Sequence, residues 1–166
     1  DLGDVGRWGG KERLVRWLGR AGIERRSPMK IDHQYNFAFG GARCASLLEG
    51  TNRQLQPLLA LMDRDPERWR RGAIVIRIGI NDLQDVETLE AMARNPDDPE
   101  IVTKVASCTN SIARAVALIR ARHPHIPILL VGGMTEADFP IRFGSWQSAR
   151  EMGNIDAALD LFDDAL

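Results

Sequence analysis

Cysteine and long apolar runs are both scarce in this chain. Cys44 and Cys108 are the only cysteines among 166 residues, too few for the disulfide framework of a small secreted domain or for a structural zinc site. We therefore expect both to be small buried hydrophobic residues. No apolar segment reaches the roughly 18 residues that cross a bilayer, and residues 1–10 lack the apolar core of a signal peptide. The expectation is a soluble chain with no transmembrane segment, whose compartment stays open between cytoplasm, periplasm and medium.

An excess of charge of one sign is also missing. The 22 basic and 23 acidic residues leave a formal charge of −1, so no net field attracts nucleic acid or an anionic membrane. The hydrophobic share of 44% and the charged share of 27% are typical of soluble globular proteins. No repeat, low-complexity tract or long linker divides the sequence. We expect residues 1–166 to form one domain.

The spacing of apolar residues predicts helices that alternate with strands. Helical spacing occurs at 11–21, at 51–62, after the cap Asp98-Pro99, and in a last helix that begins at Gln147 or Asn154. The third of these helices should bury one stripe, formed by Ile101, Val105, Cys108, Ile112, Ala115 and Ile119. Apolar runs predict strands at 33–39, 73–80 and 126–131, the second buried on both faces. The alternation favours a doubly wound parallel sheet with helices on both faces.

Residues that directly follow the predicted strands are the first candidates for a site. They are Gly40-Gly41, Asn81-Asp82 and Gly132-Gly133. In a parallel sheet the ligand crevice lies beyond the carboxyl ends of the strands. A glycine lets a backbone N–H approach a ligand closely, and an Asn amide offers two donors. Each pair alone is also explained by a turn or a helix cap, but their joint placement indicates an oxyanion hole.

Three short blocks, in order along the chain, resemble those of the SGNH hydrolases, also called the GDSL esterase/lipase family. Residues 36–42 (NFAFGGA) resemble the second block, 79–82 (GIND) the third, and 1–6 (DLGDVG) the first block without its nucleophile. The resemblance implies a three-layer α/β/α, flavodoxin-like fold and hydrolysis of a carboxylic ester by a serine. It also implies an oxyanion hole made of the nucleophile's own N–H, the N–H of Gly41 and the side-chain amide of Asn81. Asp1 then marks the nucleophile position.

The chain departs from this family in three respects. Asp1 stands where a serine should precede Leu2, so a serine has either dropped out or been replaced. No Asp-x-x-His motif follows Asn81 to supply the base, and His33, His123 and His125 lie at the amino ends of the predicted strands. The family's first strand, which precedes the nucleophile, is absent as well. We expect residues 1–166 to be incomplete at both ends, unless another segment fills the gap.

Several functions fit this sequence, and one is favoured. It is a serine esterase, lipase or carbohydrate acetylesterase that acts on a small-molecule or carbohydrate ester. The first alternative is a catalytically inactive carbohydrate- or acyl-binding module in which Asp1 is genuine. A phosphate- or nucleotide-binding flavodoxin-like protein would need a glycine-rich phosphate motif that the chain lacks. No metal or cofactor is expected, because Asp82 and Glu136 have no histidine beside them.

The sequence leaves open the role of two aromatic residues, the acyl group of the substrate and the oligomeric state. Phe143 and Trp146, after the third predicted strand, either line a substrate pocket or pack against the last helix. The acyl group of the substrate depends on the loops that line the pocket. The oligomeric state has no signal in the sequence.

Overall fold

The structure is a computed structural model that describes residues 35–38, 40–51, 53–132 and 148–166. The chain divides into two compact units, residues 1–38 and 39–166. In the first unit the described residues 35–38 form no strand, so the predicted strand at 33–39 is wrong over them. Instead the Asn36 side chain accepts a hydrogen bond from the Ala38 N–H at 2.9 Å, a local turn contact that competes with strand pairing. The helix predicted at 11–21 lies outside the described residues.

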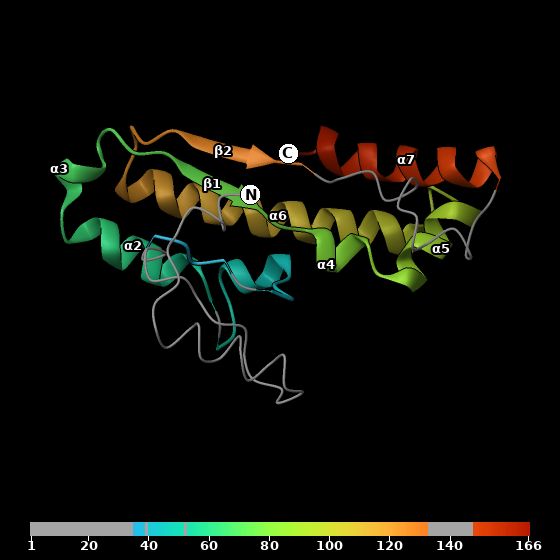
Figure 1. Cartoon of the computed structure of the whole chain (residues 1–166), viewed down its shortest axis with the longest axis horizontal. Helices are drawn as coiled ribbons and strands as arrows, with labels where there is room; N and C mark the ends of the chain where they lie inside the picture. Colours follow the sequence, from blue (N-terminus) through green and yellow to red (C-terminus); the bar gives the residue numbers. More distant parts are fainter. Residues whose placement is uncertain (1–34, 39, 52, 133–147) are drawn as a thin grey trace, which may run out of the picture. The chain divides into compact units, whose positions relative to one another are not determined.

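The second unit contains two parallel strands. β1 (Ile74–Arg77) pairs with β2 (Ile128–Val131), with Ile74 opposite Ile128, and Figure 1 shows them running side by side. Both predicted strands are therefore confirmed, although each is shorter than expected. The prediction that β1 is buried on both faces is wrong, because Val75 and its partner Leu129 are 48% and 58% exposed. The helix-covered second face of a three-layer fold stays a prediction.

The helix α6 (Pro99–Arg122) is the centre of the hydrophobic core. Asp98 caps it by accepting a hydrogen bond from the Glu100 N–H, and Pro99 stands at its first position, as predicted. The predicted stripe from Ile101 to Ile119 is buried along its full length. Four other elements contact this helix, namely the short 3₁₀ helix η2 (Cys44–Leu47), α4 (Ile80–Leu83), α5 (Val86–Arg94) and α7 (Ala149–Asp164).

Two more predicted helices are present with adjusted ends. The helix expected at 51–62 is α2 (Leu55–Asp63), which is followed by the short α3 (Pro66–Trp69). The last helix, α7, begins after Ser148, whose side chain and that of Glu151 form a capping box. The pattern did not predict α3, α4 or α5, since four to nine residues give too few turns for a clear apolar period.

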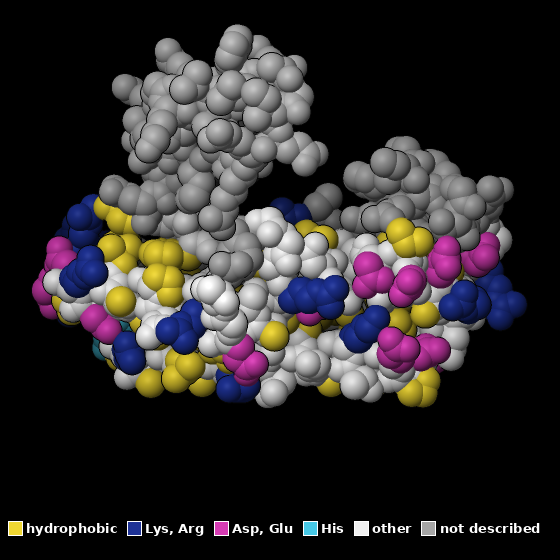
Figure 2. Space-filling model, turned by 90° about the horizontal axis from the view of Figure 1, so that it is seen from below, with side chains coloured by type: hydrophobic (Ala, Val, Ile, Leu, Met, Phe, Trp, Pro, Cys, Tyr) yellow, Lys and Arg dark blue, Asp and Glu magenta, His cyan; other side chains and the backbone are white. Residues whose placement is uncertain are grey.

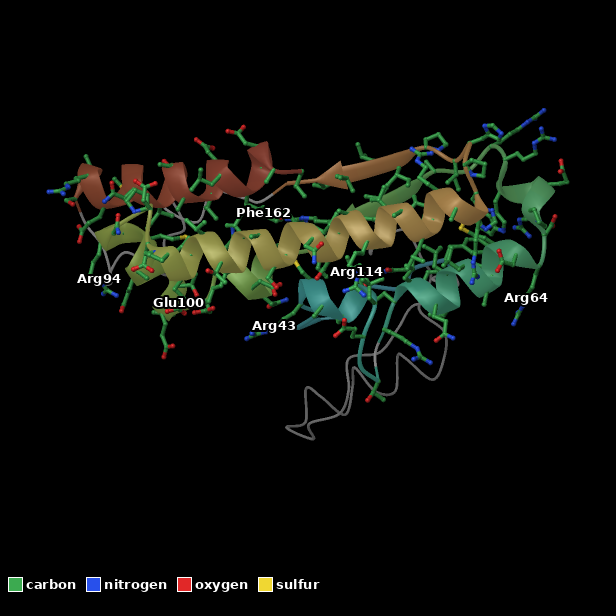
Figure 3. The ribbon with its side chains drawn as sticks, turned by 180° about the vertical axis from the view of Figure 1, so that it is seen from behind. Arg43, Arg64, Arg94, Glu100, Arg114 and Phe162 are labelled. Atoms are coloured by element: carbon green, nitrogen blue, oxygen red, sulfur yellow. A yellow bond between two sulfur atoms is a disulfide. The ribbon has the colours of Figure 1, made fainter. Side chains whose placement is uncertain are left out.

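The helix α7 is held against the rest of the unit at both of its ends. Near its start, Asn154 donates a hydrogen bond from Nδ2 to the carbonyl of Ala93 at 2.8 Å, at the end of α5. Near its end, Phe162 is fully buried and lies between α7 and α6 (Figure 3). On the face of the described part in Figure 2, basic and acidic side chains are interspersed, as the balanced composition suggests. No helix in the described ranges is long and apolar enough to cross a membrane.

Candidate active site at the carboxyl end of β1

The turn after β1 depends on a glycine. Gly79 has φ +113°, a conformation that side chains with a Cβ rarely adopt, and it precedes α4 directly. A Cβ added there would meet the Phe162 ring at 2.9 Å and the Cys108 sulfur at 3.5 Å. Because α6 and α7 both approach this turn so closely, only glycine fits. This turn therefore sets the direction of α4, the short helix that carries Asn81 and Asp82. From the sequence, these two residues were expected only to follow a strand.

The glycine pair of the second block forms a turn that leads into η2. Gly41 has φ +79°, and no described atom lies within 4 Å of a Cβ built on it. Glycine at 41 therefore serves the backbone conformation, and no residue that the structure describes fills the space beside it. The next residue, Ala42, is 8% exposed, and Cys44, two residues further on, is 1% exposed. The exposed turn is thus attached directly to a buried anchor.

A disulfide joins this anchor to the core helix. Cys44 and Cys108 are bonded, with their Cα atoms 5.0 Å apart and a sequence separation of 64. The prediction that both residues are buried is confirmed, but the idea that they are merely apolar side chains is wrong. The sequence did place Cys108 in the buried stripe of α6, and Cys44 directly after the glycine turn. Those two positions are the signal from which the pairing could have been expected.

Two consecutive side chains of α4 join the turn after β1 to the segment after the glycine pair. Asn81 donates a hydrogen bond from Nδ2 to the carbonyl of Ala42 at 2.9 Å. Asp82 accepts a hydrogen bond through Oδ2 from the Cys44 N–H, also at 2.9 Å. These contacts span 39 and 38 residues of sequence. The structure thus joins the Asn-Asp pair to the segment that follows the Gly-Gly pair, although the described residues before the glycines, 35–38, form no strand.

The carboxylates near this junction lie in contrasting surroundings. Partial burial raises the pKa of Asp82, although the Cys44 N–H and the charges of Arg43 and Lys104 act to lower it. Burial also acts to raise the pKa of Asp85, but there the hydrogen bonds from Thr88 and the charge of Lys104 prevail and lower it. Asp85 caps α5, and Lys104 in turn donates to the Thr88 hydroxyl at 2.7 Å. Of the two carboxyl groups, Asp82 is therefore the one whose ionised form is destabilised, on balance, by the loss of solvent.

The Asp82 carboxylate lies close to both sulfur atoms of the disulfide. One oxygen of Asp82 and the sulfurs of Cys44 and Cys108 are all within 4.8 Å of one another. Two thiolates and a carboxylate at such spacing would suit a divalent cation. In the disulfide, however, the sulfurs are bonded to each other and carry no thiolate charge. The cluster is therefore a structural junction in this form of the protein.

The remaining predicted site residues fall into two groups. Asp1, His33, Phe143 and Trp146, together with Gly133 and Glu136, lie outside the described residues. His123 and His125 precede β2, at its amino end, as the sequence indicated. His123 contacts Asp63 there through Nε2 at 3.1 Å. Neither of these two histidines is at the carboxyl end of β1.

A parallel strand pair with helices, and with an amide side chain after β1 that bonds the segment after a glycine turn, is an α/β arrangement in which a ligand crevice is expected at the carboxyl edge of the sheet. The sequence matches the model of the GDSL-like lipase/acylhydrolase family over residues 3–162, and the chain belongs to this family. The resemblance to this family is thereby confirmed. Membership implies a flavodoxin-like α/β fold and a hydrolase of the esterase or lipase type. No curated protein and no solved structure gives a significant match to the chain.

Proposed function

We propose that this chain carries the oxyanion hole of a serine-dependent carboxylic ester hydrolase, formed by the Gly41 N–H and the Asn81 side-chain amide. The observation that supports it best is the hydrogen bond from Asn81 Nδ2 to the Ala42 carbonyl. It links the third sequence block to the residue that follows Gly41. The chain's membership in a lipase and acylhydrolase family gives the reaction class.

The chemistry of ester hydrolysis explains why these two donors matter. Attack on the ester carbonyl places a negative charge on its oxygen. A hydrogen-bond donor that is already in position stabilises this charge and lowers the activation barrier by roughly 3 kcal/mol. An Asn amide has two N–H bonds. In our proposal one N–H donates to the Ala42 carbonyl and holds the side chain in place. The second N–H donates a hydrogen bond to the oxyanion. Gly41 contributes its backbone N–H from a turn beside which no described residue fills the space.

The nucleophile and the base complete the proposal. The serine belongs at the position that Asp1 marks, next to Leu2. A general base takes its hydroxyl proton, the serine oxygen attacks the ester carbon, and the alcohol leaves with that proton. Water then hydrolyses the acyl-enzyme to the carboxylic acid and the free serine. A carboxylate at that position would be a poor nucleophile for this route. His123 is not the base in this scheme, because it lies before β2 and contacts Asp63. Residues 1–166 contain no Asp-x-x-His motif, so the proposal assigns the base to none of them.

Labelling and hydrolysis together test this function. The full-length form of the protein is treated with a fluorophosphonate, which marks an activated serine, and is assayed with p-nitrophenyl esters of increasing acyl length. We expect covalent labelling and turnover of at least one ester. The acyl length that gives the highest kcat/KM identifies the substrate class. A folded protein that neither reacts with the fluorophosphonate nor hydrolyses any ester contradicts the proposal and favours a binding module.

A further inference from the structure

The segment between Gly41 and η2 is held by two hydrogen bonds of opposite polarity. Asn81 donates to the Ala42 carbonyl, and Asp82 accepts from the Cys44 N–H. Both side chains leave the same short helix, α4, in consecutive positions. A sliding or rotation of the 42–44 backbone would break at least one of the two bonds. The pair therefore determines both the place and the orientation of this segment.

We propose that Asp82 is a positioning residue for the oxyanion hole, acting through the Cys44 N–H to fix the turn at Gly41. This inference rests on the proposed function above. Asp82 itself does not touch the substrate in this scheme. Its role is to hold the backbone that carries the Gly41 N–H, while Asn81 contributes the second donor.

The disulfide alone does not perform this role. It fixes the sulfur of Cys44 relative to α6, but the Cα–Cβ bond between that sulfur and the backbone leaves the peptide group free to turn. Cys44 is 1% exposed, so its N–H has no access to bulk water and depends on a protein acceptor. Asp82 is that acceptor. Without it, the buried N–H would seek another partner, and the 41–44 backbone would shift.

The cost of keeping Asp82 charged also agrees with a role beyond packing. Partial burial penalises the charged form of this carboxyl group, and the positive charges of Arg43 and Lys104 offset the penalty only in part. An ionised carboxylate makes a stronger and shorter hydrogen bond to a backbone N–H than a neutral acceptor does. Charge at this position thus stiffens the bond that holds the loop.

Three variants of the full-length protein separate positioning from stability. Asp82→Ala removes the acceptor, Asp82→Asn keeps an oxygen at the same place, and Asp85→Ala is the matched control. Asp85 also accepts a backbone N–H at a helix start, from Thr88 at 2.9 Å, but it lies outside the site. For each variant kcat and KM are measured with a p-nitrophenyl ester, beside the thermal unfolding midpoint and the exchange rate of the Cys44 amide proton.

We expect Asp82→Ala to lower kcat by roughly tenfold or more with KM changed by less than about threefold, because a misplaced donor acts on the transition state. The Cys44 amide should exchange faster in the same variant. Asp82→Asn should recover most of kcat. Asp85→Ala should lower the unfolding midpoint and leave kcat within about twofold of the parent. If Asp82→Ala does not fold, Asp82→Glu, which moves the acceptor by one methylene, should lower kcat while Asp82→Asn does not.

Each contrary outcome has a distinct meaning. An active parent protein whose Asp82→Ala variant, or Asp82→Glu in its place, keeps full kcat overturns the role of Asp82 alone. A kcat loss in Asp82→Ala that Asp85→Ala matches also overturns it, because the effect is then one of general stability. A folded parent protein that hydrolyses no ester overturns the proposed function, and the positioning role with it.

Discussion

The two ends of the parallel strands use polar side chains in different ways. At the carboxyl end, Asn81 and Asp82 bond to the main chain of a segment 38 or more residues away. At the amino end, the contacts are local along the chain or join side chains: Arg120 donates to the carbonyls of Pro124 and Ile126, four and six residues further on. Asp63 accepts from Arg122 at 2.9 Å and contacts His123 at 3.1 Å, beside a cavity of about 280 Å³ that Trp69 and His125 help to line.

This difference indicates which end fixes a backbone segment that is distant in sequence. A side chain that bonds a buried main-chain group specifies the path of a loop, since that group has few other partners. An ion pair between exposed side chains is replaced by water at little cost. The charged groups at the amino end pair with one another. The carboxyl end has a glycine at positive φ, a disulfide, and two hydrogen bonds from α4 side chains to the main chain of residues 42 and 44. Substitutions at the two ends should therefore differ in kind.

The largest loss of stability is expected when the disulfide is removed. It closes a loop of 64 residues, which in the chain-entropy description stabilises the fold by about 4 kcal/mol. The double variant Cys44→Ala with Cys108→Ala should lose about this amount in urea unfolding. Reduction with dithiothreitol should destabilise the parent and leave the double variant unchanged. A loss below about 1 kcal/mol would contradict the account, because a disulfide across so long a loop should give more.

A slightly smaller loss is expected at the turn after β1. Gly79→Ala combines an unfavourable positive φ with overlap against Phe162, and should cost about 3 kcal/mol in urea unfolding. Gly153→Ala is the control, because Gly153 lies within α7 and an added Cβ there meets nothing within 4 Å. Alanine at 153 should stabilise the protein by about 0.5–1 kcal/mol. Equal effects of the two substitutions would show that the approach of α6 and α7 does not restrict residue 79.

The amino end should tolerate substitution well. Asp63→Ala removes the partner of Arg122 and His123, whose pairs with Asp63 are partly exposed to solvent. We expect a loss below about 1 kcal/mol that shrinks further in high salt, with ester hydrolysis unchanged. The measurements are urea unfolding at two salt concentrations and an esterase assay. A large fall in activity would place part of the site at this end and reverse the comparison.

The smallest effects are changes in the pH dependence of stability, and they should differ in sign for two neighbouring carboxyl groups. The pKa of Asp85 is lowered in the fold, so its contribution is present above its unfolded pKa and is lost as the pH falls through the folded value. The pKa of Asp82 is raised, so its contribution is present at acid pH and is lost as the pH rises through the folded value.

The substitutions Asp85→Asn and Asp82→Asn reveal these signs. Relative to the parent, Asp85→Asn should be less stable near pH 7, and the difference should shrink on acidification. Asp82→Asn should instead gain on the parent as the pH rises. Urea unfolding between about pH 3 and pH 7 checks both. Parallel trends for the two variants would contradict the contrast in their surroundings.

Much of this architecture could be predicted from the sequence because the signals were local. The cap at Asp98-Pro99 and the apolar period after it predicted α6 and all six residues of its buried stripe. The apolar runs predicted β1 and β2. The Asn-Asp pair does contact the segment after the Gly-Gly pair, but the strand expected before the glycines is not formed over residues 35–38. Family membership was indicated by the three blocks taken together, since no single block would have been specific enough.

What the sequence left unpredicted depends on contacts between distant residues. The end of β1 at Arg77 follows from the conformation of Gly79, which the nearby Phe162 makes necessary across 83 residues of sequence. The disulfide required knowing that α6 passes beside η2. Asp82 was a candidate by its position after a strand and was weighed as a metal ligand, but nothing local shows that its carboxylate accepts from the Cys44 N–H. The exposure of Val75 depends on what covers the second face of the sheet.

The central claim is that Asn81 supplies a donor to the oxyanion, and one substitution tests it most directly. Asn81→Ala should lower the kcat/KM of the full-length protein for its best p-nitrophenyl ester by roughly 100- to 1000-fold, with the fall mainly in kcat. Asn81→Asp, which removes both N–H donors and adds a negative charge, should be at least as impaired, while Asp63→Ala keeps the parent rate. A folded Asn81→Ala variant with kcat/KM within about threefold of the parent would contradict the account.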